Sequence, residues 1–213
     1  MIGIQDILHI DKHIEVLIRD FGPQAYGILG GIVFAETGLV VTPFLPGDTL
    51  LFAAGLFCHP DKKAHLNFPL MFLVFMAAAL CGDNLNYFIG RSVGPKLFKN
   101  ENSKIFRKSH LDKTHHFFEK HGKKTIILAR FVPVVRTFSP FVAGMGKMPY
   151  REFLLYSFLG ALLWVGIFLT GGYLLGDLDV VKENFSVAML VMAVLTFLPM
   201  GYEVWKARKN GEI

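Results

Sequence analysis

The sequence predicts an all-α integral membrane protein built as an inverted repeat. Hydrophobic residues make up 53% of the 213 residues, more than an ordinary soluble domain carries. Several apolar runs approach the roughly 20 residues that a membrane-spanning helix needs. Two other apolar segments, 34–48 and 129–140, contain both proline and charged residues, and the same order of broken and unbroken segments occurs in each half.

The first element that we expect is an amphipathic helix in residues 1–24. Between residues 4 and 21 the apolar residues recur at helical spacing, and charged residues fill the opposite face. Such a helix lies along the membrane surface or packs on the rest of the protein, and the pattern fits both. No basic region with a small-residue cleavage site precedes the first apolar run, so we expect no cleaved signal peptide.

A membrane domain is expected in residues 25–176, and its first element covers residues 25–57. This segment is apolar but is interrupted by Pro43, Pro46 and Gly47. Proline removes backbone donors and Pro-Gly-Asp favours a turn, so one straight helix fits poorly. Irregular backbone at membrane depth is tolerated only where protein or a polar cavity shields it. We therefore predict a re-entrant hairpin of two short helices that meet near Pro46 and Gly47.

The rest of the chain repeats this order and then adds one helix. A spanning helix is expected at 66–90, followed by a basic loop at 91–124. Pro133 and Pro140 break the next apolar segment, so we predict a second re-entrant hairpin at 125–146. The remaining expected elements are a spanning helix at 152–176, a C-terminal spanning helix at 184–205 and a tail at 206–213.

Short motifs indicate that the two halves are related. Phe44-Leu-Pro46 recurs as Phe131-Val-Pro133, and Tyr87-x-x-Gly90 recurs as Tyr173-x-x-Gly176 at nearly the same offset. Ala53-Ala54-Gly55 has a rough counterpart in Val142-Ala143-Gly144. Each match is weak alone, but the near-constant offset favours an internal repeat.

The charges predict the orientation of the repeat. Lysine and arginine far outnumber acids in the 91–124 loop, and Lys206, Arg208 and Lys209 follow the last apolar run. The positive-inside rule places both segments in the cytoplasm. The two hairpins then enter from opposite faces, and the N-terminal segment lies outside. Inverted repeats with broken helices are a common way to build a transport site at the membrane midplane.

Four charged residues in the broken segments are the main candidates for function. Glu36 and Asp48 lie on opposite arms of the first hairpin, where desolvation would let a carboxyl group load and release a proton. Arg130 and Arg136 flank a proline. An unbroken helix would set the two about 240° apart, so only a broken one aims both at one centre. A guanidinium stays charged and suits phosphate, which predicts binding of a phosphate headgroup.

Structural interpretations compete with these functional ones. Either acid can simply pair with an arginine, and Asp48 can cap the helix that follows Pro-Gly. Arg130 can anchor the cytoplasmic interface. In the first spanning helix, Asp83, Asn84 and Tyr87 are candidates to line the same polar pathway, or they form hydrogen bonds between helices.

Other function classes find little support. The histidines of the basic loop, His110, His115, His116 and His121, have no helical i,i+4 pair and no completing acid or cysteine, so no metal is expected. No catalytic triad, nucleotide loop or nucleic-acid motif is present, which favours a transporter over an enzyme and predicts no cofactor and no nucleic-acid partner. Cys58 and Cys81 are not expected to form a disulfide.

The motifs, taken together, resemble the DedA family of bacterial inner-membrane proteins. The likeness covers roughly residues 22–176. The stretches that carry it are Glu36-Thr-Gly with Phe44-Leu-Pro-Gly-Asp48, Gly82-Asp83-x-x-x-Tyr87-x-x-Gly90-Arg91, Arg130-Phe-Val-Pro-x-x-Arg136-x-x-x-Pro140, Ala143-Gly144, Gly160-Ala-Leu-Leu-Trp164 and Gly172-Tyr173-x-x-Gly176.

This resemblance implies two opposed re-entrant hairpins in a multi-pass protein of the bacterial inner membrane. It also implies that Glu36, Asp48, Arg130 and Arg136 match the family's functionally required acids and arginines. Family members are linked to membrane homeostasis that depends on the proton motive force, to envelope integrity and to cell division. Some move lipid phosphates, notably undecaprenyl phosphate, others move phospholipids, and related eukaryotic proteins are lipid scramblases.

The leading expectation is therefore a translocase (flippase) of lipid phosphates that is linked to the proton motive force. Its partners would be membrane lipids, the lipid-phosphate substrate and protons, and the sequence is compatible with a homo-oligomer. An antiporter that exchanges small cationic molecules or drugs for protons is an alternative, although two arginines beside the acids count against it. A structural membrane protein that supports cell division or envelope integrity is an alternative of another class.

Overall fold

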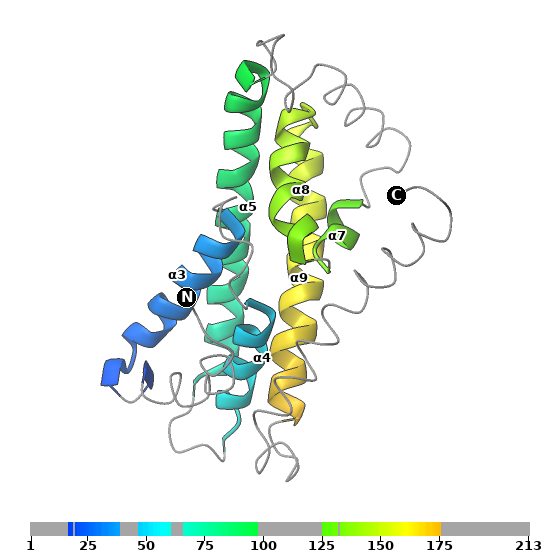
Figure 1. The fold of residues 1–213 in the computed structure, drawn as a ribbon. Coiled ribbons are helices and arrows are strands. Elements are labelled where there is room, and N and C mark those ends of the chain that lie inside the picture. The colour runs from blue at the N-terminus through cyan, green and yellow to red at the C-terminus, as the bar shows by residue number, and fades with distance from the viewer. Residues whose placement is uncertain are drawn as a thin grey trace. The chain divides into compact units, whose positions relative to one another are not determined.

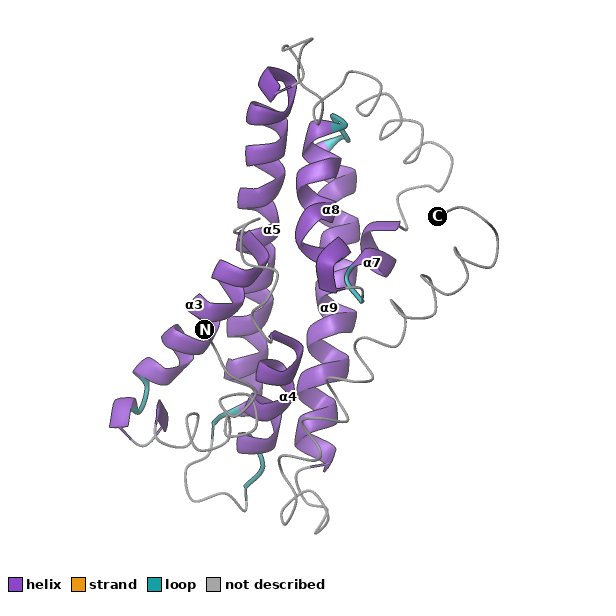
Figure 2. Ribbon diagram, in the orientation of Figure 1, coloured by secondary structure: helices purple, strands orange, loops and turns teal. Residues whose placement is uncertain are grey.

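The computed structural model describes residues 17–18, 20–38, 47–60, 66–97, 125–131 and 133–175. Figure 1 labels the helices of this part, and Figure 2 shows that it consists of helices and loops without a strand. The all-α class is thus confirmed for the described residues. The helices are α3 (Gln24–Gly38), α4 (Gly47–Phe57), α5 (Phe68–Leu97), α7 (Thr125–Ala129), α8 (Pro133–Met145) and α9 (Tyr150–Leu175).

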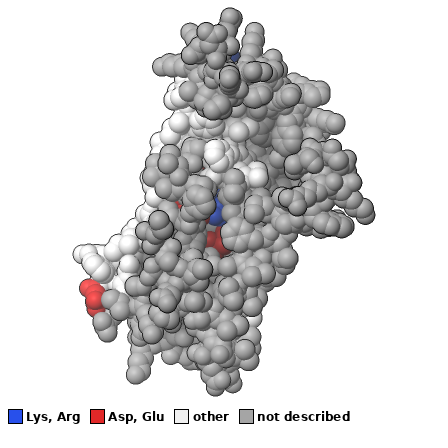
Figure 3. All heavy atoms as spheres, in the orientation of Figure 1, with Lys and Arg blue, Asp and Glu red and all other residues white. Residues whose placement is uncertain are grey.

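Two of these helices, α5 and α9, are long and apolar enough to cross a membrane, over Phe68–Val93 and Tyr150–Leu175. They occupy the two segments where spanning helices are expected, and α5 continues to Leu97, beyond the expected end. Large apolar side chains on both remain exposed, among them Leu73 at 65% and Leu174 at 66%. On the face drawn in Figure 3, the described surface shows few charged atoms. Such surfaces suit lipid better than water.

The arms of the first expected hairpin are present as α3 and α4. The connection between them, which contains Pro43 and Pro46, lies outside the described residues, so the turn itself stays a prediction. Gly47 is the first residue of α4.

The second broken segment consists of α7, a turn at Arg130 and Phe131, and α8. Pro133 is the first residue of α8, where the missing N–H would have no helical partner in any case. Pro140 was expected to break this segment, but it lies inside α8, which continues to Met145. A proline in a helix interior removes one backbone hydrogen bond without necessarily ending the helix, and here it cannot donate to the carbonyl of Arg136.

Several expected elements lie outside the described residues. These are the helix at 1–24 apart from its last residues, the basic loop beyond residue 97, the C-terminal spanning helix at 184–205 and the tail at 206–213.

The described chain divides into two compact units, and the division falls within three helices. Unit 1 contains α3 up to Ile32, α4, α5 up to Met76, and α9 from Trp164 onward. Unit 2 contains the end of α3 from Val33, the rest of α5, α7, α8, and α9 up to Leu163.

In unit 1, α4 and α9 cross at two glycines. A Cβ at Gly55 would overlap the backbone carbonyl of Leu169, and a Cβ at Gly172 would overlap that of Phe52. Glycine is therefore required at both positions for the helices to approach this closely. Also in this unit, the side chain of Asn67 caps α5 by accepting a hydrogen bond from the N–H of Leu70 at 3.0 Å.

In unit 2, α8 and α5 cross in the same manner. A Cβ at Gly144 would overlap the carbonyl of Tyr87, and a Cβ at Gly90 would overlap that of Phe141. The two crossings share a pattern, because each glycine faces a carbonyl three residues before the glycine of the other helix. The two units therefore share this mode of helix crossing, and the inverted repeat itself stays a prediction.

The last turn of α8 closes with a Schellman motif. The N–H of Met148 donates to the carbonyl of Ala143 at 3.0 Å, and the N–H of Lys147 donates to that of Gly144 at 3.0 Å. Lys147 takes the left-handed position that usually holds glycine, with φ of 54°. This compact turn leads directly into α9.

Candidate functional site

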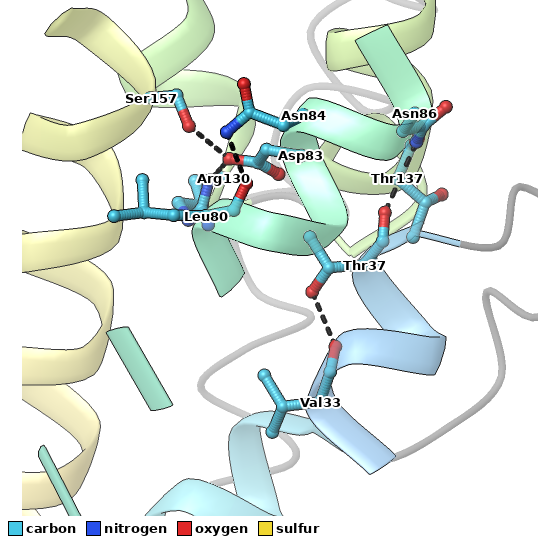
Figure 4. Close-up of polar contacts among 9 residues, drawn as sticks. All are labelled: Val33, Thr37, Leu80, Asp83, Asn84, Asn86, Arg130, Thr137 and Ser157. Carbon is cyan, nitrogen blue, oxygen red and sulfur yellow. Dashed lines mark hydrogen bonds and ion pairs between the residues drawn. The ribbon is translucent and has the colours of Figure 1, made fainter. Parts of the chain in front are cut away.

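The centre of unit 2 holds an ion pair between Arg130 and Asp83. Nη1 of Arg130 donates to Oδ2 of Asp83 at 2.5 Å. Ser157 of α9 donates its hydroxyl proton to the same carboxylate oxygen. Figure 4 shows the Asp83 carboxylate between the guanidinium and the hydroxyl. The turn after α7, helix α5 and helix α9 thus meet at one carboxylate.

A second ion pair in unit 2 joins Glu36 of α3 to Arg136 of α8. Nη2 of Arg136 donates to Oε1 of Glu36 at 2.5 Å. The two residues are 100 positions apart in the sequence. Three of the four main candidates for function, Glu36, Arg130 and Arg136, therefore lie in one unit together with Asp83.

The two ion pairs belong to one electrostatic group, which we call the charge cluster (Glu36, Asp83, Arg130 and Arg136). Arg136 also acts electrostatically on Asp83 and on Arg130. The exposed fractions of Glu36, Asp83, Arg130 and Arg136 are 1%, 0%, 3% and 4%. Two carboxylates and two guanidiniums balance in formal charge, which is how a protein can keep such groups in an apolar interior.

Asn86 links the ends of two helices beside the charge cluster. Its Nδ2 donates to the carbonyl of Thr137 in α8 at 2.5 Å and to that of Thr37, near the end of α3, at 3.3 Å. Figure 4 shows Asn86 between these two segments. The Thr37 carbonyl lies at a helix C-terminus, where carbonyl groups lack partners within the helix. Asn86 supplies one, and it is fully buried.

Sequence reasoning did not select Ser157 as a site residue, and it noted Asn86 only as part of a polar band of the first spanning helix that could line the same pathway. Asn86 lies three residues after Asp83, so the two share one face of α5, and this spacing was the available signal. Ser157 stands alone in the apolar run of α9 and gave no such signal.

Small residues create the space for this arrangement. Gly82 is so close to the end of α3 that a Cβ there would come within 2.9 Å of the Thr37 side chain. A Cβ on Gly160 of α9 would come within 3.3 Å of Cδ of Arg130. Larger residues at these two positions would displace α3 or the Arg130 side chain.

Asp48, the fourth main candidate, lies in unit 1. It occupies the first turn of α4, where a carboxylate is favoured by the helix dipole. Nε1 of Trp164 in α9 donates to its Oδ1 at 2.7 Å, and Asp48 is 8% exposed. The sequence allowed Asp48 to cap this helix, but α4 begins at Gly47, so Asp48 lies inside its first turn, and the tryptophan partner was not expected.

The other two candidates on α5 make structural contacts. Tyr87 was a candidate to line a polar pathway, but it is fully buried in an apolar cluster and stacks on Phe153 at a ring separation of 4.4 Å. Its hydroxyl donates to the carbonyl of Met148 at 2.5 Å and accepts from Arg91 at 2.8 Å. Asn84 is half-buried and accepts a hydrogen bond from the Tyr150 hydroxyl at 2.8 Å. These contacts belong to the packing around the cluster.

The charge cluster pairs two guanidiniums with two carboxylates. Each guanidinium offers several donors in a fixed plane, a geometry that carboxylate and phosphate satisfy equally well. No group of three metal-ligating side chains occurs among the described residues.

Comparison with known proteins assigns this chain to one family of membrane proteins. The model of the VTT domain matches residues 45–174. The chain therefore belongs to the VTT-domain family, also known as the DedA family.

Curated relatives cover nearly the whole chain. It is 52% identical to Protein DedA of Escherichia coli K12 over 206 residues, which is 97% of this chain and 94% of the relative. It is 40% identical to an uncharacterized membrane protein of Mycobacterium leprae, over 84% of this chain and 79% of the relative. It is 35% identical to the E. coli K12 inner membrane protein YqjA, over 80% of this chain and 78% of the relative. No solved structure matches the chain.

Proposed function

We propose that this protein is a translocase of lipid phosphates that is linked to the proton motive force. The substrate class includes undecaprenyl phosphate and phospholipids. In this proposal Arg130 and Arg136 bind the phosphate headgroup, and Glu36 and Asp48 exchange protons. The protein acts as a transporter and not as an enzyme, and its partners are lipids and protons.

The observation that carries the proposal is the burial of two arginines in one unit of a membrane protein. A charged group at mid-membrane costs about 2.5–3.5 kcal/mol even on the lenient insertion scale, so buried ionisable residues in this setting are functional candidates by default. Arg130 and Arg136 are 3% and 4% exposed and lie within one electrostatic group. An anionic headgroup is the ligand that a guanidinium favours.

The proposal includes a membrane arrangement. The segments at 25–57 and 125–146 are re-entrant hairpins that enter from opposite faces, and the basic loop and the C-terminus are cytoplasmic. The location is the bacterial inner membrane. The relative named Inner membrane protein YqjA supports this assignment by analogy.

The cation/proton antiporter has weaker support. Such a protein needs carboxylates that are open to a cationic substrate, whereas Glu36 and Asp83 each hold an arginine at 2.5 Å. A headgroup anion is attracted by the same arginines that would repel a cation.

The test is the rate of lipid movement between leaflets in proteoliposomes, measured with and without a pH gradient. Undecaprenyl phosphate and a phospholipid are assayed separately, and wild type is compared with Arg136→Ala. The matched control is Arg151→Ala, which removes an exposed arginine outside the cluster. We expect the gradient to accelerate movement of at least one lipid, Arg136→Ala to abolish it and Arg151→Ala to preserve it.

Two outcomes would overturn the proposal. Well-folded wild-type protein that moves neither lipid excludes a translocase of these substrates. Uptake of a cationic dye that depends on the pH gradient and on Glu36 favours the antiporter, and absence of both activities favours a structural role in the envelope.

A further inference from the structure

Unit 2 contains a buried carboxylate, Asp83, that the proposed transport roles leave unused. Oδ2 of Asp83 accepts from Arg130 at 2.5 Å and from the Ser157 hydroxyl. Its other oxygen, Oδ1, is buried and has no hydrogen-bond partner among the described residues. The side chain thus holds one guanidinium firmly while half of its own hydrogen-bonding capacity is unsatisfied.

We infer that Asp83 is the exchangeable counter-ion of Arg130, and that Ser157 positions it for the exchange. An incoming phosphate headgroup replaces the Asp83 carboxylate on the guanidinium, and Asp83 takes Arg130 back when the headgroup leaves. This inference rests on the proposed function and names the residue against which the headgroup competes.

The first argument is the burial of both partners. A guanidinium that is 3% exposed cannot remain without an anion, because an uncompensated buried charge is strongly destabilising. Carboxylate and phosphate bind the same planar donors. Binding of a headgroup at Arg130 is therefore an exchange between two anions. The measured binding free energy is the difference between the phosphate–Arg130 interaction and the Asp83–Arg130 interaction.

The second argument is the contact with Ser157. This hydroxyl donates to the oxygen that also binds Arg130. A hydrogen bond to a carboxylate is worth more once the guanidinium no longer shares its charge. Ser157 therefore stabilises the state in which Arg130 has left more than the state in which it is paired.

These arguments predict effects of opposite sign for two residues in contact. Asp83→Asn removes the competing charge but keeps the shape of the side chain, so the headgroup should bind more tightly. Ser157→Ala removes the donor that supports the released carboxylate, so the headgroup should bind more weakly. A residue that only maintains the fold would weaken binding in both variants.

The experiment measures equilibrium binding of farnesyl phosphate to the full chain in lipid nanodiscs. Farnesol tests whether the charge is needed, and inorganic phosphate tests whether the lipid tail is needed. We expect about tenfold tighter binding for Asp83→Asn, since loss of a buried competing charge is worth at least one decade of affinity. We expect roughly fivefold weaker binding for Ser157→Ala. Ser139→Ala, a buried serine of α8 outside the cluster, should match wild type.

A second readout separates exchange from simple affinity. In the proteoliposome assay, Asp83→Asn should slow lipid movement at saturating substrate, because no carboxylate displaces the bound headgroup. A lower apparent KM with a lower maximal rate is the expected signature.

The outcomes distinguish this inference from the proposed function. Wild type that neither binds nor moves the lipid defeats the proposed function itself. Wild type that transports, together with weaker or unchanged binding in Asp83→Asn, overturns the counter-ion role. If Asp83→Asn does not fold, binding by Ser157→Ala equal to or tighter than wild type overturns it.

Discussion

At the scale of the residue, Glu36 and Arg136 show how charge is kept inside an apolar helical protein. Each alone would cost about 2.5–3.5 kcal/mol at mid-membrane. Their contact at 2.5 Å, between residues 100 positions apart, holds the end of α3 to α8. The pair is therefore a structural link as well as a candidate for function, and the two roles can be separated by experiment.

The first prediction separates these roles with a double substitution. Glu36→Gln or Arg136→Gln alone should destabilise the protein by about 3–5 kcal/mol, because each leaves a buried charge without its partner. The double variant should recover much of this loss, because two amides can still hydrogen-bond. Thermal unfolding in detergent measures stability, and the leaflet assay measures transport. A double variant that recovers both stability and full transport would contradict the functional role.

Sequence reasoning reached the charged residues but not all of their partners. It placed Glu36, Arg130 and Arg136 in broken segments that converge, and three of the four residues of the charge cluster follow from that argument. It did not assign Asp83 to Arg130 or Trp164 to Asp48. Such pairing depends on the rotation of each helix about its axis and on how closely the segments approach, as at Gly160 beside Arg130, and neither quantity can be read from sequence spacing.

The second prediction concerns the pH dependence of a buried thiol. Burial raises the pKa of Cys58 from 9.0 to about 12. The thiolate is the reactive form, so maleimide labelling of Cys58 should be slow near neutral pH and should keep rising about tenfold per pH unit beyond pH 9. An ordinary thiol levels off near its unshifted pKa. The measurement uses the folded Cys81→Ser variant, in which Cys58 is the remaining cysteine. A labelling rate that levels off near pH 9 would contradict the prediction.

At the scale of the element, glycines determine where the helices cross. The sequence repeat aligned Gly90 with Gly176, but the residue that occupies the equivalent crossing in unit 1 is Gly172, about one helical turn earlier. Matching the Tyr-x-x-Gly motifs selected a glycine one turn away from the crossing. Several glycines recur along α9, and only their contacts with α4 show which of them lies at the crossing. The rough match of Gly55 with Gly144 identified the correct pair of crossing residues.

The third prediction tests these crossings by adding one methyl group. Gly90→Ala or Gly144→Ala should destabilise the protein by about 3 kcal/mol or more, because the new Cβ overlaps backbone that cannot move away. Gly166→Ala in α9 is the matched control, because no atom lies within 4 Å of its added Cβ. It should be neutral or stabilising by up to about 1 kcal/mol. Equal effects in all three variants, measured by thermal unfolding in one detergent, would contradict close packing at the crossings.

At the scale of the whole molecule, hydrophobicity predicted the class and the location of the long helices. Helices α5 and α9 lie where continuous apolar runs predicted spanning helices. An apolar segment at membrane depth forms a helix because its backbone polar groups must pair with one another in the absence of water. The division into two compact units was not predictable in this way. It cuts α3, α5 and α9 within continuous helices, where composition and hydrophobicity do not change.

The fourth prediction concerns membrane topology, for which the charges of the loops give the expectation. In a Cys58→Ala, Cys81→Ala background, Lys108→Cys in the basic loop and Asn210→Cys in the tail should react with a membrane-impermeant maleimide in inside-out vesicles. Neither should react in intact cells. The rule that lysine and arginine remain in the cytoplasm predicts the same side for both positions.

Opposite labelling of the two sites would contradict the expected pair of spanning helices between them, because two spans return the chain to the same side. Labelling of both from outside would keep the repeat but reverse it. The hairpin that carries Arg130 and Arg136 would then enter from the outer face. The proton motive force always draws protons inward. In the reversed protein, protons would therefore pass the carboxylates in the opposite direction with respect to this hairpin. The side of two cysteines therefore decides which leaflet the arginine-bearing hairpin would meet first.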